Sequence, residues 1–225
     1  MANAIMLALI EREKSGQGQK IDIAIYDCLY SILEGNPITY CMKGKIGDRM
    51  GNSDPTAAPY DTFRTNDGYV AVGVSTDKQW ISFCEALGFD DLAADERYFK
   101  NNDRVALYYD GLRDEIESRT AKMSKFDIEE KLGAARVSCG GVYTVTEAMA
   151  TEQVKSRDML VEVYDEGIGE NIRIPGVTIK LRGTPGSVDA GAPNLGRDTK
   201  AYLGALGYDD AAISALQEKG VIEMP

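Results

Sequence analysis

The protein is a chain of 225 residues with a formal net charge of −11 and no histidine. The negative charge repels phosphate backbones and anionic lipid, which argues against nucleic acid or a membrane as the main partner. The absence of histidine excludes Ser-His triads, Cys-His dyads and most zinc sites.

The first 36 residues are predicted to form a helix, a short strand and a second helix. An apolar segment predicts a helix over residues 2–14, alternating isoleucines predict a strand over residues 21–25, and spacing of three and four predicts a helix over residues 26–33. The apolar start is too short to span a membrane and lacks the basic region of a secretory signal, so we expect a cytoplasmic protein.

Residues 35–59 are predicted to form a long loop, because they contain four glycines and three prolines. Lys43, Lys45 and Arg49 give this segment a local excess of positive charge. Two interpretations of the loop remain open, a functional pocket loop and a plain interdomain linker.

The middle of the chain is predicted to be a hairpin followed by helices. Residues 60–74 alternate in hydrophobicity around Asn66-Asp67-Gly68, a sequence typical of a tight turn. Helices are then predicted from Thr76 to Gly88, over residues 104–119 and from Ser124 onward, with an irregular stretch at 92–99.

The last third is predicted to contain fewer packed elements. We expect a turn and strand over 137–145, a helix over 146–154, an antiparallel pair at 160–163 and 172–174, an extended stretch over 175–193, and helices over 199–206 and 210–219.

The four cysteines form no CxxC pair, and with no secretory signal we expect buried, reduced thiols. They are Cys28, Cys41, Cys84 and Cys139. No basic residue that would activate Cys139 flanks it in the sequence.

An ordered series of short motifs resembles class III CoA-transferases of the CaiB/BaiF type, which include formyl-CoA and carnitine CoA-transferases. The motifs extend over essentially the whole chain. They are residues 8–22 (ALIEREKSGQGQKID), 49–52 (RMGN), 57–61 (AAPYD), 65–70 (TNDGYV), 79–84 (QWISFC), 86–88 (ALG), 138–142 (SCGGV), 175–177 (PGV), 184–186 (TPG) and 192–196 (APNLG).

The resemblance implies an α/β fold with an α+β insertion, in which a Rossmann-like large domain is built from both ends of the chain. On this basis residues 1–36 are a large-domain segment, 37–59 a linker or pocket loop, 60–145 the small α+β domain, and 146–225 a connector that returns to the large domain. The chain corresponds to the C-terminal portion of such an enzyme.

The resemblance also implies the chemistry. In the family an aspartate carboxylate attacks an acyl-CoA thioester, forms an anhydride, and then carries CoA as a thioester before passing it to a second carboxylic acid. Counting back along the motif places that aspartate before Met1, so we expect no catalytic residue in this chain and an inactive chain when it is alone. Asp22 and Asp27 are expected to have solvated or capping roles.

The acceptor side of the pocket is where this chain is expected to contribute. The resemblance assigns substrate contact to Arg49, Gly51, Asn52, Pro59 and Tyr60. The segment 51–59 lacks the glycine run that forms a mobile lid in formyl-CoA transferases, so we expect a more rigid pocket loop. The basic residues of the loop are expected either to meet CoA phosphates or to be solvated.

The expected ligands are an acyl-CoA and a carboxylic acid acceptor, with CoA as a substrate, no separate cofactor and no metal. We expect a homodimer or association with a missing N-terminal half. Two alternatives remain open: an α-methylacyl-CoA racemase of the same superfamily, and a truncated module without catalytic activity.

Overall fold

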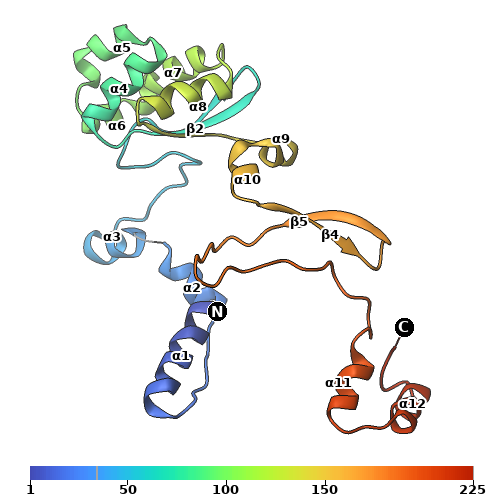
Figure 1. The fold of residues 1–225 in the computed structure, drawn as a ribbon. Coiled ribbons are helices and arrows are strands. Elements are labelled where there is room, and N and C mark those ends of the chain that lie inside the picture. The colour runs from blue at the N-terminus through green and yellow to red at the C-terminus, as the bar shows by residue number, and fades with distance from the viewer. Residues whose placement is uncertain (34, 225) are drawn as a thin grey trace. The chain divides into compact units, whose positions relative to one another are not determined.

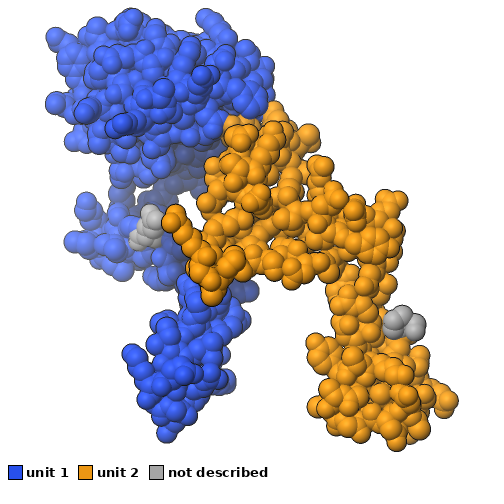
Figure 2. Space-filling model, in the orientation of Figure 1, with its two compact units in different colours: residues 1–140 blue, residues 141–225 orange. Residues whose placement is uncertain are grey.

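A computed structural model describes residues 1–33 and 35–224 of the chain. They divide into two compact units, Met1–Gly140 and Gly141–Pro225 (Figures 1 and 2). Each unit is described by itself below.

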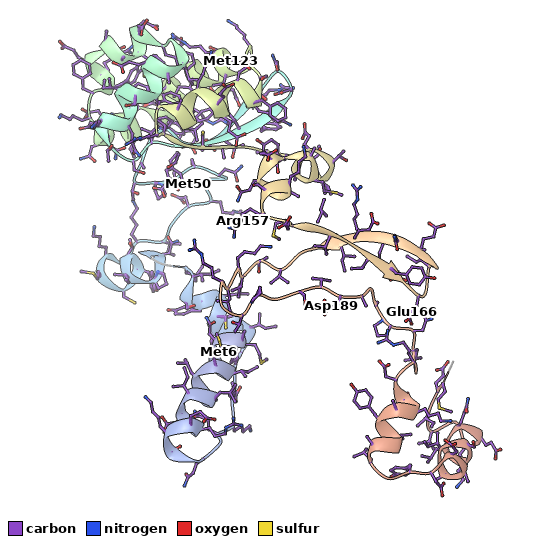
Figure 3. All side chains as sticks on the ribbon, in the orientation of Figure 1. Met6, Met50, Met123, Arg157, Glu166 and Asp189 are labelled. Carbon is purple, nitrogen blue, oxygen red and sulfur yellow. The ribbon has the colours of Figure 1, made fainter. Side chains whose placement is uncertain are left out.

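Three helices open the first unit, and none of them buries a residue. They are α1 (Ala2–Ser15), α2 (Ile25–Ser31) and α3 (Gly35–Lys43). α1 ends at Gly16, whose positive φ of 73° lets its N–H donate to the Arg12 carbonyl at 2.8 Å. The side chains of α1, including Met6, project away from the helix without a covering layer (Figure 3).

The predicted helices at 2–14 and 26–33 are confirmed, whereas the strand at 21–25 is wrong. Residues 17–24 have no regular structure, and α2 begins at Ile25. An alternating apolar pattern becomes a strand only when a neighbouring strand accepts its hydrogen bonds, and no described strand pairs with this segment.

The loop predicted over residues 35–59 is wrong for its first nine residues, which form α3. Pro37 lies in the first turn of this helix, where a missing N–H costs nothing because that group would have no helical partner. Residues 44–59 remain outside helices and strands, as predicted.

The core of the first unit is a small sheet covered by helices. β1 (Tyr60–Thr65) and β2 (Gly68–Gly73) form the predicted antiparallel hairpin with Phe63 opposite Val70, and β3 (Ser138–Gly141) lies next to β2. The side chain of Asp67 stabilises the turn by accepting from the Thr65 hydroxyl at 2.8 Å.

Six helical segments and one short 3₁₀ turn belong to this core. They are α4 (Asp77–Leu87), α5 (Asp90–Ala94), the 3₁₀ turn η1 (Glu96–Tyr98), α6 (Asn101–Ala106), the π-helical segment η2 (Tyr108–Leu112), α7 (Arg113–Thr120) and α8 (Lys125–Ala134). The stretch predicted to be irregular at 92–99 is therefore partly helical.

The core itself is a continuous apolar cluster between the hairpin and these helices. Trp80, Phe83, Leu112, Ile116, Ile128 and Leu132 are fully buried in it together with Phe63 and Val70. The Trp80 ring lies 5.7 Å from the Phe83 ring and carries the guanidinium of Arg104 at 5.3 Å from its centre.

The starts of α4 and α8 follow their predicted caps. Thr76 and Gln79 form a capping box at the start of α4, and the Ser124 hydroxyl accepts from the Asp127 N–H at 3.0 Å. The single helix predicted over 104–119 is instead broken in the middle, because Gly111 adopts a φ of 126° that a helix does not contain.

The second unit contains α9 (Val145–Ala150), α10 (Glu152–Ser156), β4 (Leu160–Asp165), β5 (Glu170–Pro175), α11 (Thr199–Ala205) and α12 (Asp210–Glu218). β4 and β5 form the predicted antiparallel pair, with Val161 opposite Ile174. The helix predicted over 146–154 is two helices, because the extended Thr151 ends α9 and caps α10.

All four cysteines are free thiols, but the prediction that they are buried is wrong for two of them. Cys84 is buried and Cys139 is half-buried, whereas Cys28 and Cys41 are exposed on α2 and α3. These two helices lack the neighbouring layer that would cover them. None of the helices in the described part of the chain combines the length and apolar character that crossing a bilayer needs.

Candidate functional site

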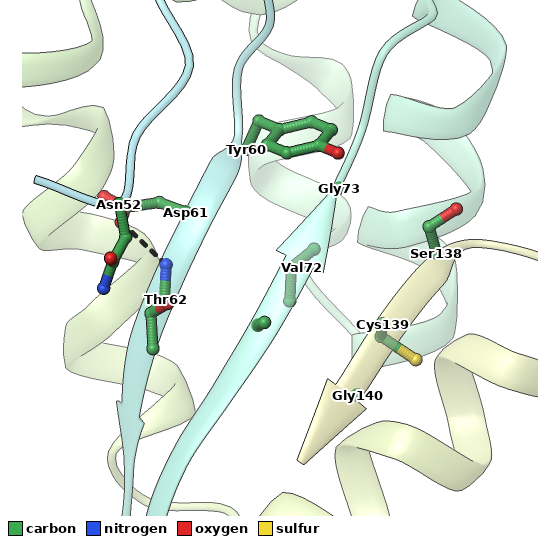
Figure 4. A pocket seen from close by; sticks show the side chains of 10 residues that line it. Asn52, Tyr60, Asp61, Thr62, Val72, Gly73, Ser138, Cys139 and Gly140 are labelled. Atoms are coloured by element: carbon green, nitrogen blue, oxygen red, sulfur yellow. Dashed lines mark hydrogen bonds between the residues drawn. The ribbon is translucent and has the colours of Figure 1, made fainter. Parts of the chain in front are cut away.

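A pocket of about 310 Å³ lies on the first unit, where the hairpin meets the loop that precedes it (Figure 4). Its walls come from this loop and from all three strands of the sheet. The lining residues are Asn52, Tyr60, Asp61, Thr62, Ala71, Val72, Gly73, Ser138, Cys139 and Gly140.

The aromatic wall of the pocket depends on a glycine. Tyr60 stands opposite Gly73 in the strand register, and a Cβ atom at residue 73 would lie only 3.0 Å from Cε2 of the tyrosine ring. Tyr60 is 44% exposed, and its ring lies against the strand on one side and is open to the pocket on the other. A side chain at position 73 would displace this wall.

Asp61 is a buried carboxylate whose oxygens already have partners. One oxygen accepts from the Tyr108 hydroxyl at 3.0 Å and from Nε of Arg113 at 3.1 Å, and the other accepts from the Thr62 N–H at 2.7 Å. Burial and the adjacent carboxylate raise the pKa of Tyr108. Because its charge is balanced and its lone pairs are used, Asp61 shapes the wall and is poorly placed to act as a nucleophile.

The Cys139 thiol is also in the pocket wall but is not activated. Its Sγ donates to the Glu129 carbonyl at 3.7 Å. Burial, reinforced by the Glu129 carboxylate, raises the pKa of the thiol, which favours the neutral form at neutral pH. This agrees with the absence of a flanking basic residue in the sequence.

The structure brings together two of the five predicted substrate-contact residues. Asn52 and Tyr60 both line the pocket. Pro59 is buried behind it, where its carbonyl accepts from the Val74 N–H at 2.8 Å. Arg49 and Gly51 are exposed and lie outside the lining. Substrate contact by each of the five remains a prediction.

The predicted basic cluster does not reach this pocket. Lys43, Lys45 and Arg49 are exposed, and Lys45 lines a separate pocket of about 330 Å³ with Leu33, residues of α3 and the loop after it. Binding of CoA phosphates by this cluster stays a prediction. Within residues 1–33 and 35–224, no three His, Cys, Asp or Glu side chains gather closely enough to hold a metal ion.

Asp61, Thr62 and Ser138–Gly140 are wall residues that were not assigned to the site from the sequence. Residues 138–142 form one of the sequence motifs, but nothing local in this motif indicates that β3 lies beside β2.

Most of the chain is similar in sequence to a known protein family. Residues 1–199 match the family described as CoA-transferase family III. The chain belongs to this family. The resemblance noted in the sequence is thereby confirmed, and the mixed α/β fold agrees with it.

Curated relatives of this family III chain are enzymes with CoA-transferase names. It is 34% identical over 206 residues to the succinyl-CoA:mesaconate CoA-transferase of Haloarcula hispanica, covering 92% of this chain and 51% of that protein. It is 32% identical to the succinate–glutarate CoA-transferase of Agrobacterium fabrum, covering 91% and 50%. The chain therefore spans about half the length of the curated relatives it matches.

Solved structures that resemble this chain are likewise matched over about half of their own length. A CaiB/BaiF family protein from Brucella suis is 32% identical, with a TM-score of 0.71 over 90% of this family III chain and 52% of that one. Rv3272 from Mycobacterium tuberculosis shares the fold at 22% identity, with a TM-score of 0.69 over 89% and 52%.

Proposed function

We propose that residues 1–225 are part of an enzyme that transfers CoA from an acyl-CoA to a carboxylic acid. The observation that carries the proposal is the family III match over residues 1–199, together with relatives named as succinyl-CoA:mesaconate, succinate–glutarate and succinyl-CoA–D-citramalate CoA-transferases. These names favour short dicarboxylic acids as donor and acceptor. The chain would serve as the C-terminal portion and would act with a segment equivalent to the other half of its relatives.

The proposed chemistry is exchange at a carboxylate. An enzyme carboxylate attacks the thioester carbonyl, the C–S bond breaks, and an anhydride forms as CoA thiolate leaves. The thiolate then attacks the enzyme's own acyl carbon, which releases the first acid and leaves an enzyme–CoA thioester. The second acid repeats the two steps in reverse and departs as a new acyl-CoA. We assign the attacking aspartate to a segment outside residues 1–225.

In this proposal the chain supplies the acceptor side of the pocket. Asn52 and Tyr60 would contact the acid, Pro59 would hold the strand behind them, and Arg49 and Gly51 would meet the substrate where the loop enters the pocket. Residues 60–145 would act as the small domain, while 1–36 and the C-terminal part would complete the large one. Assembly as a homodimer belongs to the same proposal.

The test is an assay of CoA transfer with succinyl-CoA as donor and mesaconate, glutarate or citramalate as acceptor, followed by mass spectrometry of the products. We expect transfer by the complete protein, an enzyme–CoA thioester trapped when the acceptor is omitted, and no transfer by residues 1–225 alone. Robust transfer by residues 1–225 alone would show that the nucleophile lies within them. Inversion of an α-methylacyl-CoA without any transfer would instead support the racemase alternative.

A further inference from the structure

The loop that enters β1 is held by side chains from a distant part of the chain. Residues 50–58 belong to no helix or strand, yet several of their backbone groups are hydrogen-bonded to side chains of residues 101–109. The loop carries Asn52 and leads directly into Tyr60, so its placement decides where two pocket walls stand.

Asn101, the first residue of α6, bridges two positions of the loop. Its Nδ2 donates to the Thr56 carbonyl at 2.7 Å, and its Oδ1 accepts from the Ala58 N–H at 3.2 Å. A single amide thus satisfies a backbone acceptor and a backbone donor, as a neighbouring strand would do. Its own N–H is held by Oδ1 of Asp77 at 2.8 Å, which ties the contact to the start of α4.

Arg104 holds the end of the loop from inside the core. The residue is fully buried, and its Nε donates to the Ala58 carbonyl at 2.8 Å while one terminal nitrogen donates to the Tyr98 carbonyl at 2.8 Å. The other terminal nitrogen forms an ion pair with Asp77 at 3.3 Å. A guanidinium buried in the core has lost its water, so breaking one of its hydrogen bonds would leave a buried charge without that partner. The bond from Arg104 to the Ala58 carbonyl therefore holds the loop firmly.

Tyr109 holds the beginning of the loop. Its hydroxyl is hydrogen-bonded to the Ser53 hydroxyl and donates to the Met50 carbonyl at 3.4 Å. The Ser53 hydroxyl also bonds the Met50 carbonyl, at 2.8 Å. The loop is thus held on both sides of Asn52 and Pro55.

We propose that Asn101, Arg104 and Tyr109 are positioning residues, which keep the loop 50–58 in one conformation and thereby set the acceptor specificity of the pocket. The inference rests on the proposed function, because it takes this pocket as the acceptor site. It assigns a fixed wall to residues 50–58 of the pocket.

The first experiment measures hydrogen exchange in residues 1–225. Asn101→Ala should make the amides of residues 56–58 exchange about tenfold faster, because the bonds of Asn101 to the Ala58 N–H and to the Thr56 carbonyl are lost. Peptides from α4 and α8 should not change. Asn102→Ala, at the exposed next residue of the same helix, is the matched control and should behave as the unmodified chain. Unchanged exchange in the loop of the Asn101 variant would overturn the proposal.

A second variant covers the case in which the first does not fold. Tyr109→Phe removes only a hydroxyl from a side chain that is largely exposed, so the core should remain intact. We expect faster exchange of residues 50–54 alone. Equal exchange in this variant and the unmodified chain would likewise contradict the proposed role of Tyr109.

The second experiment measures transfer by the complete enzyme. Asn101→Ala should raise the KM for the acceptor acid by about tenfold with kcat changed much less, because the loss is in substrate placement. Asn102→Ala should leave both constants unchanged. Transfer with identical constants in the Asn101 variant would overturn the positioning role only, whereas absence of transfer in the unmodified enzyme would overturn the proposed function.

Discussion

Tyr60 and Gly73 together show how one absent side chain can make room for a pocket wall. The ring occupies the space that a Cβ atom at residue 73 would need, at 3.0 Å from Cε2. Glycine weakens a strand because it has no side chain to pack. At this position the loss is offset by the close approach of an aromatic ring.

This contact gives the first prediction. Gly73→Val should lower the free energy of unfolding by about 1–3 kcal/mol, because the new side chain overlaps the Tyr60 ring. In a Tyr60→Ala background the same change should cost less than about 0.5 kcal/mol, since the overlap is gone. Urea unfolding of the four proteins measures the difference, and equal costs in both backgrounds would refute the contact as the cause.

The sequence indicated those pocket residues that lie within short local motifs. Asn52 and Tyr60 lie within short motifs, so the resemblance located them without knowledge of the fold. Asp61 lies within such a motif too. Its role in the pocket wall, however, depends on the hydrogen bond from Tyr108 and the ion pair with Arg113, which are 47 and 52 residues away. Contacts at such separations are created by packing, and no local pattern encodes them.

At the scale of elements, predictions succeeded where the signal was local. The hairpin of β1 and β2 follows from Asn66-Asp67-Gly68, and the start of α4 follows from the cap residue Thr76. The strand predicted at 21–25 is wrong because a strand needs a partner, and the single helix predicted over 104–119 is wrong because Gly111 adopts a φ of 126° that breaks it.

An ion pair between α5 and α7 gives the second prediction. Asp91 and Arg119 form two hydrogen bonds of 2.6 Å, and the arginine lowers the pKa of Asp91 from 3.8 to about 2. A lowered pKa in the folded state means that the pair stabilises the fold above pH 4 and loses this effect as the pH falls through about 2. Asp91→Asn should therefore reduce stability at pH 7 and have little effect at pH 2.

Urea midpoints at both pH values test this expectation. Asp90→Asn, at the neighbouring exposed residue of the same helix, is the control and should leave the midpoint nearly unchanged. The effect should shrink in high salt, since Asp91 is 67% exposed and solvent screens the pair. An equal loss of stability at pH 7 and pH 2 would assign the effect to something other than the carboxylate charge.

At the scale of the whole molecule, burial is uneven. The cluster around Trp80 contains most of the buried apolar residues, whereas α1, α2 and α3 bury none. Relatives about twice as long share this part of the sequence. We infer that the first helices pack against a segment equivalent to the remainder of those relatives.

The difference in burial between α1–α3 and the core around Trp80 gives the third prediction. In residues 1–225 alone, amides of α1–α3 should exchange near the rate of an unfolded peptide, because isolated helices of this length are marginal in water. Amides of β1, β2, α4 and α8 should be protected by several orders of magnitude. Hydrogen exchange followed by mass spectrometry measures both, and strong protection of α1–α3 in the isolated chain would contradict the inferred missing contact.

The position of Trp80 determines what optical spectroscopy can report about this protein. It is the single tryptophan of the chain, and it lies fully buried between Phe83 and Arg104. Its fluorescence emission therefore reports the unfolding of the core around Trp80. It does not report unfolding of the first three helices or of residues 141–224. A sharp fluorescence transition would describe that core alone, and circular dichroism would have to follow the rest.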